Sequence, residues 1–296
     1  MLRSAAEHIG SERRLEAFVV DDGIGVADKE RTEQSLPGNV SVNWVSPSRK
    51  NFGGLPLWGR MPITTYDKLT VGDVLPASVS RAIWLDCDIL VLADLGELWD
   101  RPFMGAIVMA VQDSLVPFVS SRFGVSGYDE LGIEPGAPYF NAGMMVIDLA
   151  AWRASDVSKR ALDHLKNFGH RVFFWDQEAL NAVLAGKWQR LDPLWNWSAN
   201  LDRLSAGSNG NARKPDPDRI VHFNGNIKPW RVNAGTNLDI AYFRVVDETA
   251  WSGWRPRRSP RSSLLAWYGS SRFRRRVYPA EQIAVQLLRR FTQRIT

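Results

Sequence analysis

The feature that most constrains the fold is an apolar segment, residues 81–95, that carries two aspartates in its middle. The segment has the sequence RAIWLDCDILVLADL, which is typical of a buried β-strand except for Asp86 and Asp88. Burying an unpaired carboxylate costs several kcal/mol even after the protein relaxes around it. The fold must therefore bring these two side chains to a place where their charge is compensated.

Predicted strands and helices alternate along the chain at intervals of about 20 to 30 residues, which predicts an α/β fold around a mostly parallel sheet. Strands in such sheets are covered on both faces and are therefore apolar throughout. Ligands bind beyond the carboxyl ends of the strands, which is where Asp86 and Asp88 occur. The expected strands cover residues 15–20, 39–45, 81–85, 104–113 and 219–225, and residues 139–153 are expected to form a strand followed by the start of a helix. The expected helices cover residues 26–36, 64–76, 154–168 and 176–185.

The spacing of the two aspartates suits a shared ligand. Residues two apart on an extended chain point to the same side, about 6.6 Å apart along the strand. Asp86 and Asp88 could then converge on one divalent cation, and their hard oxygen atoms favour magnesium, manganese or calcium. The alternative is that one aspartate caps a loop or helix while the other is solvated, as in most isolated pairs of this kind.

Five segments together resemble, in the same order, glycosyltransferase family 8. This family contains retaining nucleotide-sugar transferases, among them bacterial lipopolysaccharide galactosyl- and glucosyltransferases and glycogenin. The resemblance extends from about Leu15 to Trp230 and implies the nucleotide-diphospho-sugar transferase (GT-A-like) fold. The segments are TTYDKL (64–69), RAIWLDCDILVLADLGELW (81–99), YFNAGMMVIDLAAW (139–152), WDQEALN (175–181) and HFNGNIKPW (222–230).

The resemblance implies a metal and diphosphate site. Asp86, Asp88 and His222 would hold a manganese or magnesium ion, and Gly225 and Lys228 would hold the donor diphosphate. Glycine allows the backbone to approach the phosphates closely, and lysine supplies a point charge. Without this context, a histidine in an apolar strand is more often a core residue.

The resemblance also implies a pocket for the donor sugar. Lys68 occupies a position where the family usually has arginine, and the alternative is a solvated lysine on a helix surface. Asn141 could instead form a turn, and Asp176 could instead cap a helix. From the sequence we assign structural roles to Asp192 and Asn196. The implied sugar-pocket residues are Lys68, Asp113 and Asn141, with Asp176 and Gln177 as the catalytic candidates.

The activity implied is that of a metal-dependent retaining hexosyltransferase. It would move a galactose or glucose from a UDP-sugar to a lipopolysaccharide or other glycan acceptor. Front-face attack, with Gln177 stabilising the opposite face, is favoured over a covalent intermediate on Asp176. The alternatives are a nucleotide-sugar hydrolase and a non-catalytic, membrane-docked remnant that no longer binds donor.

The start of the chain differs from the family pattern. Family members open with an additional β-strand whose end contacts the nucleotide base. Only 14 residues precede the expected strand at 15–20. We therefore expect an N-terminally truncated fold that lacks the first β-unit and binds the base poorly.

The C-terminal 45 residues are strongly basic. From Ser252 onward there are eleven arginines and one acid, Glu281, while the rest of the chain has 26 basic and 31 acidic residues. We expect a glycosyltransferase domain over 1–250 and a basic tail over 251–296, with an amphipathic helix at 278–296. This helix would either dock on an anionic membrane surface or fold against the domain.

The remaining composition excludes several other classes. No nucleic-acid-binding module accompanies the basic charge, so we expect no nucleic-acid partner. The single cysteine, Cys87, excludes an intramolecular disulfide and, with four histidines in all, a multi-cysteine zinc site. Without a signal-peptide pattern or a long apolar run, the chain is expected to be cytoplasmic, at most peripheral on the inner face of the membrane.

Overall fold

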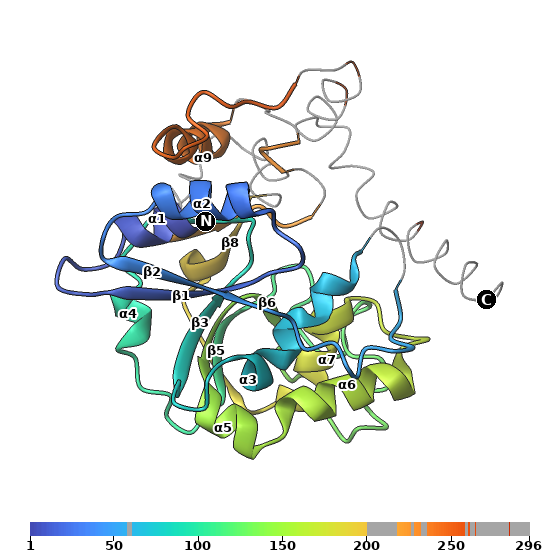
Figure 1. Cartoon of the computed structure of the whole chain (residues 1–296). Coiled ribbons are helices and arrows are strands. Elements are labelled where there is room, and N and C mark those ends of the chain that lie inside the picture. Colours follow the sequence, from blue (N-terminus) through green and yellow to red (C-terminus); the bar gives the residue numbers. More distant parts are fainter. Residues whose placement is uncertain are drawn as a thin grey trace.

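The computed structural model describes residues 1–57, 61–199, 218–225, 228–231 and 236–257, together with residues 260, 264 and 284. Strands and helices alternate over this part of the chain, and helices cover the sheets (Figure 1). The expected α/β class is therefore confirmed. Of the helix expected at 278–296 the structure describes residue 284 alone, so the division of the chain at residue 250 stays a prediction.

The described strands form three sheets, which between them contain parallel and antiparallel strand pairs. Parallel pairs are β1 with β2, β5 with β7, and β8 with β9, whereas β3 with β6, β5 with β6, and β4 with β9 are antiparallel. The expectation of a mostly parallel sheet is wrong, because an apolar strand buried on both faces has the same pattern in either direction. The bounds are β1 Leu15–Val20, β2 Val40–Val45, β3 Arg81–Leu85, β4 Ile89–Val91, β5 Val108–Gln112, β6 Phe140–Asp148, β7 Trp188–Arg190, β8 Trp197–Ser198 and β9 Ile220–His222.

The segment with the two aspartates is divided between two of these sheets. Strand β3 lies at the end of the four-stranded sheet β3–β6–β5–β7, and each of its residues is partly exposed. Strand β4 begins the three-stranded sheet β4–β9–β8 and is fully buried. Asp86, Cys87 and Asp88 form the turn between them, with the Ile89 N–H donating to the Asp86 carbonyl at 3.2 Å. The two aspartates therefore come together through a turn and not along an extended strand.

One group of helices packs against the four-stranded sheet and forms the largest core with it (Figure 1). The expected helix start before residue 153 and the expected helix at 154–168 are two separate helices, α5 and α6, and Asp156 between them adopts a left-handed conformation (φ 49°). The group comprises η1 Ile63–Thr70, α3 Val71–Val74, α5 Leu149–Ala154, α6 Val157–Phe168 and α7 Trp175–Leu184.

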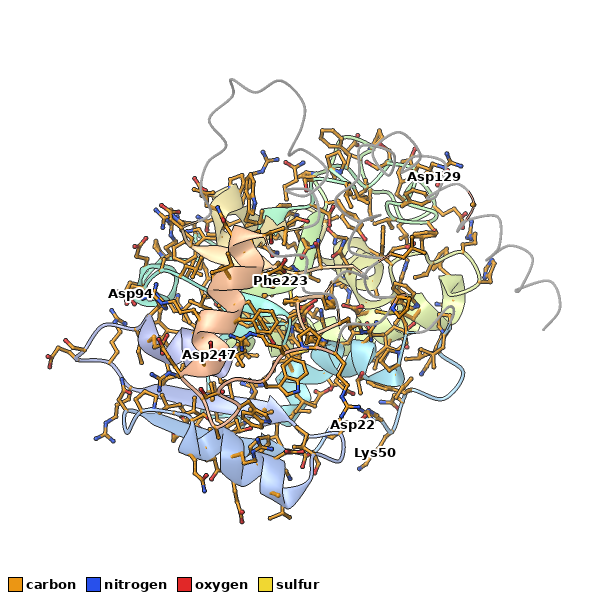
Figure 2. All side chains as sticks on the ribbon, turned by 90° about the horizontal axis from the view of Figure 1, so that it is seen from above. Asp22, Lys50, Asp94, Asp129, Phe223 and Asp247 are labelled. Carbon is orange, nitrogen blue, oxygen red and sulfur yellow. The ribbon has the colours of Figure 1, made fainter. Side chains whose placement is uncertain are left out.

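The ends of the described chain meet on another side. Helices α1 (Leu2–Glu7) and α2 (Val26–Gln34) lie above the β1–β2 pair, with α9 (Asn237–Asp247) beyond them (Figure 1). Thr236 and Asp239 form a capping box at the start of α9. Phe223, directly after β9, lies beside α9 in Figure 2, and its ring centre is 5.8 Å from that of Tyr242. Helix α9 thus covers the strand that carries His222.

Short elements complete the description: α4 spans Gly96–Trp99 and η2 spans Pro193–Asn196. Within the described residues, every helix is too short or too polar to cross a bilayer.

Candidate active site

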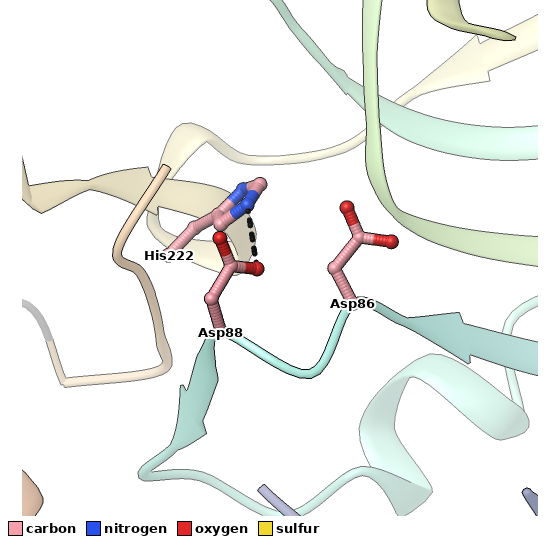
Figure 3. A group of neighbouring side chains, drawn as sticks. All are labelled: Asp86, Asp88 and His222. Atoms are coloured by element: carbon pink, nitrogen blue, oxygen red, sulfur yellow. Dashed lines mark ion pairs between the residues drawn. The ribbon is translucent and has the colours of Figure 1, made fainter. Parts of the chain in front are cut away.

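The turn after β3 brings the two aspartates together with a histidine from a distant part of the sequence. Strand β9 pairs antiparallel with β4 so that His222 lies opposite Ile89, the residue after Asp88. The Phe223 N–H also donates to the Asp88 carbonyl at 2.9 Å. Side-chain ligand atoms of Asp86, Asp88 and His222 lie within 4.8 Å of one another, and the three side chains point toward a common space (Figure 3).

Two hydrogen-bonding groups hold the His222 ring at its two nitrogen atoms. The Nε2 atom lies 3.2 Å from Asp88 Oδ1, and the Nδ1 atom lies 2.9 Å from Asn196 Oδ1. A metal-binding histidine uses one ring nitrogen as a ligand, and the other donates to an oxygen that orients it. The donor set of two carboxylates and one imidazole suits manganese or magnesium, so the residues fit a divalent cation.

A lysine compensates the first aspartate. Lys68 Nζ lies 3.0 Å from Asp86 Oδ1 and 3.0 Å from Asp176 Oδ2, and it donates to the Ala142 carbonyl at 3.2 Å. Burial disfavours the charged ammonium, but Asp176 and Asp86 outweigh that effect and raise the pKa of Lys68 above its usual value. Lys68 is therefore a buried cation inside the site, which excludes the alternative of a solvated lysine on a helix surface.

A second lysine compensates the other aspartate. Lys228 donates to Asp88 Oδ2 and, at 2.7 Å, to the Phe223 carbonyl. Burial opposes ionisation of Asp88, yet the hydrogen bonds and charges of His222 and Lys228 prevail and lower the pKa of the Asp88 carboxyl. Each of the two aspartates thus has a lysine partner, but Lys68 is shared with Asp176, so three carboxylates face two lysines and a cation would offset the remaining charge.

The expected sugar-pocket residues form a neighbouring network of hydrogen bonds. Asp113 Oδ2 accepts from Asn141 Nδ2 at 3.0 Å and from Gln177 Nε2 at 3.1 Å. Gln177 Oε1 accepts from the Ala142 N–H at 3.1 Å. Asn141 lies inside β6 rather than in a turn. The structure therefore brings Asp113, Asn141 and Gln177 together, and their contact with a sugar stays a prediction.

Asp176 does not cap helix α7. The N-cap is Phe174, and the Asp176 carboxylate instead pairs with Lys68 and accepts from Thr65 Oγ1 at 2.8 Å. Glu178 binds the backbone at the start of α7 instead, because its carboxylate accepts from the N–H groups of Phe173 and Phe174. The alternative of a purely structural Asp176 cap is therefore wrong.

Gly225 lies just beyond β9 in a left-handed conformation, with φ 77°. A residue with a side chain is strained there, so glycine is required by the backbone itself. Lys228 follows three residues later and points back to Asp88. Both residues lie on the strand connection that carries His222, and their contact with a diphosphate stays a prediction.

Two residues have places in the site that the sequence did not predict, and one of them, Asn196, was assigned only a structural role. Asn196, at the end of η2, hydrogen-bonds both His222 and Asn141. Gly143 packs so closely that a Cβ there would lie 2.1 Å from His222 Cε1. Gly143 was visible as the last residue of the YFNAG motif, whereas no local pattern marks Asn196. Asp192 has the structural role expected of it, since its side chain accepts from the Leu194 N–H at 2.9 Å at the start of η2.

Comparison with known families agrees with this geometry. Residues 2–234 match the model of Glycosyl transferase family 8, so the chain belongs to that family and is a glycosyltransferase. It is 27% identical to General stress protein A of Bacillus subtilis over 85% of this chain and 89% of that protein. It is 26% identical to the lipopolysaccharide 1,3-galactosyltransferase of Salmonella typhimurium over 81% of this chain and 71% of that protein. Other relatives are matched over a smaller share, such as 35% of the glycosyltransferase GlyB of Streptococcus pneumoniae.

Solved structures share the fold. The crystal structure of the galactosyltransferase LgtC in complex with donor and acceptor sugar analogues superposes with a TM-score of 0.70. The match covers 91% of this chain and 95% of LgtC at 23% sequence identity. The bifunctional glycosyltransferase WbbM matches with a TM-score of 0.65, over 85% of this chain and 47% of WbbM at 20% identity. The nucleotide-sugar transferase type of α/β fold, expected from the sequence, is thereby confirmed.

Proposed function

We propose that this chain is a metal-dependent, retaining hexosyltransferase that transfers galactose or glucose from a UDP-sugar to a lipopolysaccharide or other glycan acceptor. The observation that carries the proposal is the convergence of Asp86, Asp88 and His222 beside Lys228. The similarity to a lipopolysaccharide 1,3-galactosyltransferase supports the acceptor class.

The residues of the site have distinct roles in this reaction. A manganese or magnesium ion held by Asp86, Asp88 and His222 would supply positive charge to the leaving diphosphate. Lys228 reaches the same space from the His222 side, and its ammonium can turn from Asp88 to a phosphate oxygen. Asp113, Asn141 and Gln177 are already linked to one another, so a sugar would meet polar groups that need little reorganisation.

The surroundings of Asp176 support front-face attack over a covalent intermediate. Its carboxylate is buried, is neutralised by Lys68 at 3.0 Å and accepts from Thr65 at 2.8 Å. A nucleophilic carboxylate would have to give up both partners before it could attack. We therefore assign Asp176 to holding Lys68, and Gln177 to the sugar face of the site.

The two alternative functions, a hydrolase and a non-catalytic remnant, differ from a transferase in how they would use this site. A nucleotide-sugar hydrolase would use the same metal and diphosphate residues and differ only in accepting water. A non-catalytic remnant would fail to bind the donor. Docking of the basic tail on an anionic membrane stays a prediction from the sequence, because most residues of the tail lie outside those described.

A titration of UDP by calorimetry, with and without Mn²⁺, tests the proposal. We expect binding that depends on Mn²⁺, and at least a hundred-fold loss of Mn²⁺ affinity in Asp88→Asn, because the substitution removes a charged ligand. The control is Asp28→Asn, since Asp28 lies on α2 and its side chain is 61% exposed.

Turnover of UDP-galactose and UDP-glucose with a lipopolysaccharide acceptor then separates transferase from hydrolase. Sugar attached to the acceptor with retained configuration supports the proposal, and release of free sugar alone supports a hydrolase. UDP binding that is absent, or identical with and without Mn²⁺, would rule the proposal out.

A further inference from the structure

A continuous chain of side-chain hydrogen bonds connects His222 to the expected sugar pocket. His222 Nδ1 lies 2.9 Å from Asn196 Oδ1, and Asn196 Nδ2 donates to Asn141 Oδ1 at 2.9 Å. Asn141 Nδ2 donates in turn to Asp113 Oδ2, which also accepts from Gln177. The chain joins residues from five separate elements or loops, and Asn196 is the link between the histidine and the rest.

The direction of each hydrogen bond in this chain is fixed by its neighbours. The Gly143 N–H can only donate, and it lies 3.0 Å from Asn141 Oδ1, so the oxygen of that amide faces Gly143. Asn141 Oδ1 is therefore an acceptor, and the group that Asn196 turns toward it must be its NH₂. The oxygen of Asn196 consequently faces His222 Nδ1, which must carry a proton.

The other end of the chain agrees with this direction. Asp113 Oδ1 accepts from the N–H groups of Leu115 and Val116, at 2.8 Å and 3.0 Å. Its Oδ2 atom then accepts from the NH₂ groups of Asn141 and Gln177. A carboxylate that receives four donors is held firmly, and it holds the Asn141 amide in the orientation described.

From this network we infer that Asn196 is a positioning residue that keeps a proton on His222 Nδ1 and so leaves Nε2 as the nitrogen for the metal site. Nε2 lies 3.2 Å from Asp88 Oδ1 and faces the space between Asp86 and Asp88, so a cation bound there would take Nε2 as its ligand in place of that contact. The inference rests on the proposed function, and it adds that the metal ligand and the sugar-pocket residues share one hydrogen-bonded frame.

Burial gives Asn196 this influence. Asn196 and His222 are both buried, and the two polar atoms of the Asn196 amide are both used within the chain. Among the described residues, Asn196 is the hydrogen-bond partner of His222 Nδ1, whereas Asp88 already lies 3.2 Å from Nε2. Without the Asn196 oxygen, Asp88 would favour a proton on Nε2 alone, in the place of a cation. Loss of the Asn196 oxygen is therefore expected to change the tautomer and not only the stability.

Nuclear magnetic resonance of ¹⁵N-labelled histidine rings in the metal-free protein tests the inference directly. The chain has four histidines, so the His222 signals can be assigned by substitution. The wild type is expected to show a proton on Nδ1. Asn196→Leu should lose that preference, and Asn196→Asp should keep it because a carboxylate oxygen still accepts from Nδ1.

Mn²⁺ affinity, measured by electron paramagnetic resonance, gives the second readout. We expect Asn196→Leu to bind Mn²⁺ about 10- to 100-fold more weakly than the wild type. If Asn196→Leu does not fold, Asn196→Ala gives the same two readouts without adding bulk. A His222 ring that stays in the Nδ1–H form without the Asn196 oxygen would overturn the inference. Failure of the wild type to bind Mn²⁺ would overturn the proposed function, and the tautomer measurement distinguishes the two.

Discussion

Two buried histidines of this chain have opposite surroundings. His222 is 4% exposed and lies between Asn196 and Asp88, at the edge where β4 and β9 meet. His164 is 5% exposed and lies on α6, stacked on Phe168 with ring centres 5.0 Å apart. Its Nε2 atom has no hydrogen-bond partner among the described residues. Burial alone therefore does not distinguish the two positions.

The partners around a buried polar group decide whether it belongs to a candidate site. Around His164, desolvation dominates, with a contribution from Arg171, and lowers the pKa of the imidazole to about 4. Around His222, carboxylates, an amide and a lysine compensate one another, so the polar groups are already oriented. The helical layer around α6 accommodates a neutral histidine. At the β4–β9 edge, by which we mean the end of β9 and the start of β4, charged side chains have partners of opposite charge.

The largest expected effect comes from removing a charge at that edge. Lys68→Met leaves Asp86 and Asp176 without their shared cation, and breaking a buried ion pair costs about 3 to 5 kcal/mol. We expect this loss in the free energy of unfolding, measured with urea. Added Mn²⁺ should restore part of it, because an ion between Asp86 and Asp88 replaces some of the missing positive charge.

Lys159→Met is the matched control for this substitution. Lys159 forms an exposed pair with Asp163 on α6, and such pairs contribute little to stability because solvent screens them. If Lys68→Met were no more destabilising than Lys159→Met, Lys68 would not be the compensating charge of the site.

A smaller effect is expected from crowding His222 without changing any charge. In Gly143→Ala the new Cβ would lie 2.1 Å from His222 Cε1, so the ring must move away from the aspartates. We expect Mn²⁺ affinity to fall by about 100-fold, comparable to losing an orienting partner of the ligand. Gly136→Ala is the control, because nothing lies within 4 Å of its Cβ position. Equal Mn²⁺ affinity in the two variants would mean that the position of His222 does not control metal binding.

Many strands and helices could be predicted because the spacing of apolar residues indicates which side chains are buried. The strands at 15–20 and 81–85 and the helix α7 begin and end within a residue or two of their expected bounds. Strand direction could not be predicted, since hydrogen bonds to a neighbour leave no local pattern in the sequence. The exposure of β3 also went unseen, because its position at the end of a sheet depends on tertiary pairing.

The site was predictable to the extent that its residues stand in recognisable segments. Asp86, Asp88 and His222 were paired across the sequence only through the ordered motifs, and the structure places their ligand atoms together. Asn196 lies outside those motifs and acts through a contact with His222, 26 residues away. Lys68 illustrates another limit, because its double pairing with Asp86 and Asp176 depends on the packing of η1 against α7.

The smallest expected effect concerns His164 and the acid stability of the protein. Its pKa of about 4 in the folded state lies below the usual value of 6.5, so the unfolded chain binds the proton first as the pH falls. His164 therefore favours unfolding progressively between about pH 6.5 and pH 4, by about 2 to 3 kcal/mol over the whole range. His164→Leu should remove that part of the decline in unfolding free energy, measured by urea titrations at pH 7 and pH 4.5.

His170→Leu is the matched control, because His170 is exposed and follows the end of α6 by two residues. It should retain the full acid-dependent loss of stability, whereas His164→Leu should show a flatter profile. Identical profiles in the two variants would mean that burying His164 does not disfavour its protonation. The contrast with His222 would then rest on geometry alone. A flatter profile confined to His164→Leu would show that the helical layer excludes charge, while the β4–β9 edge accommodates it through its own partners.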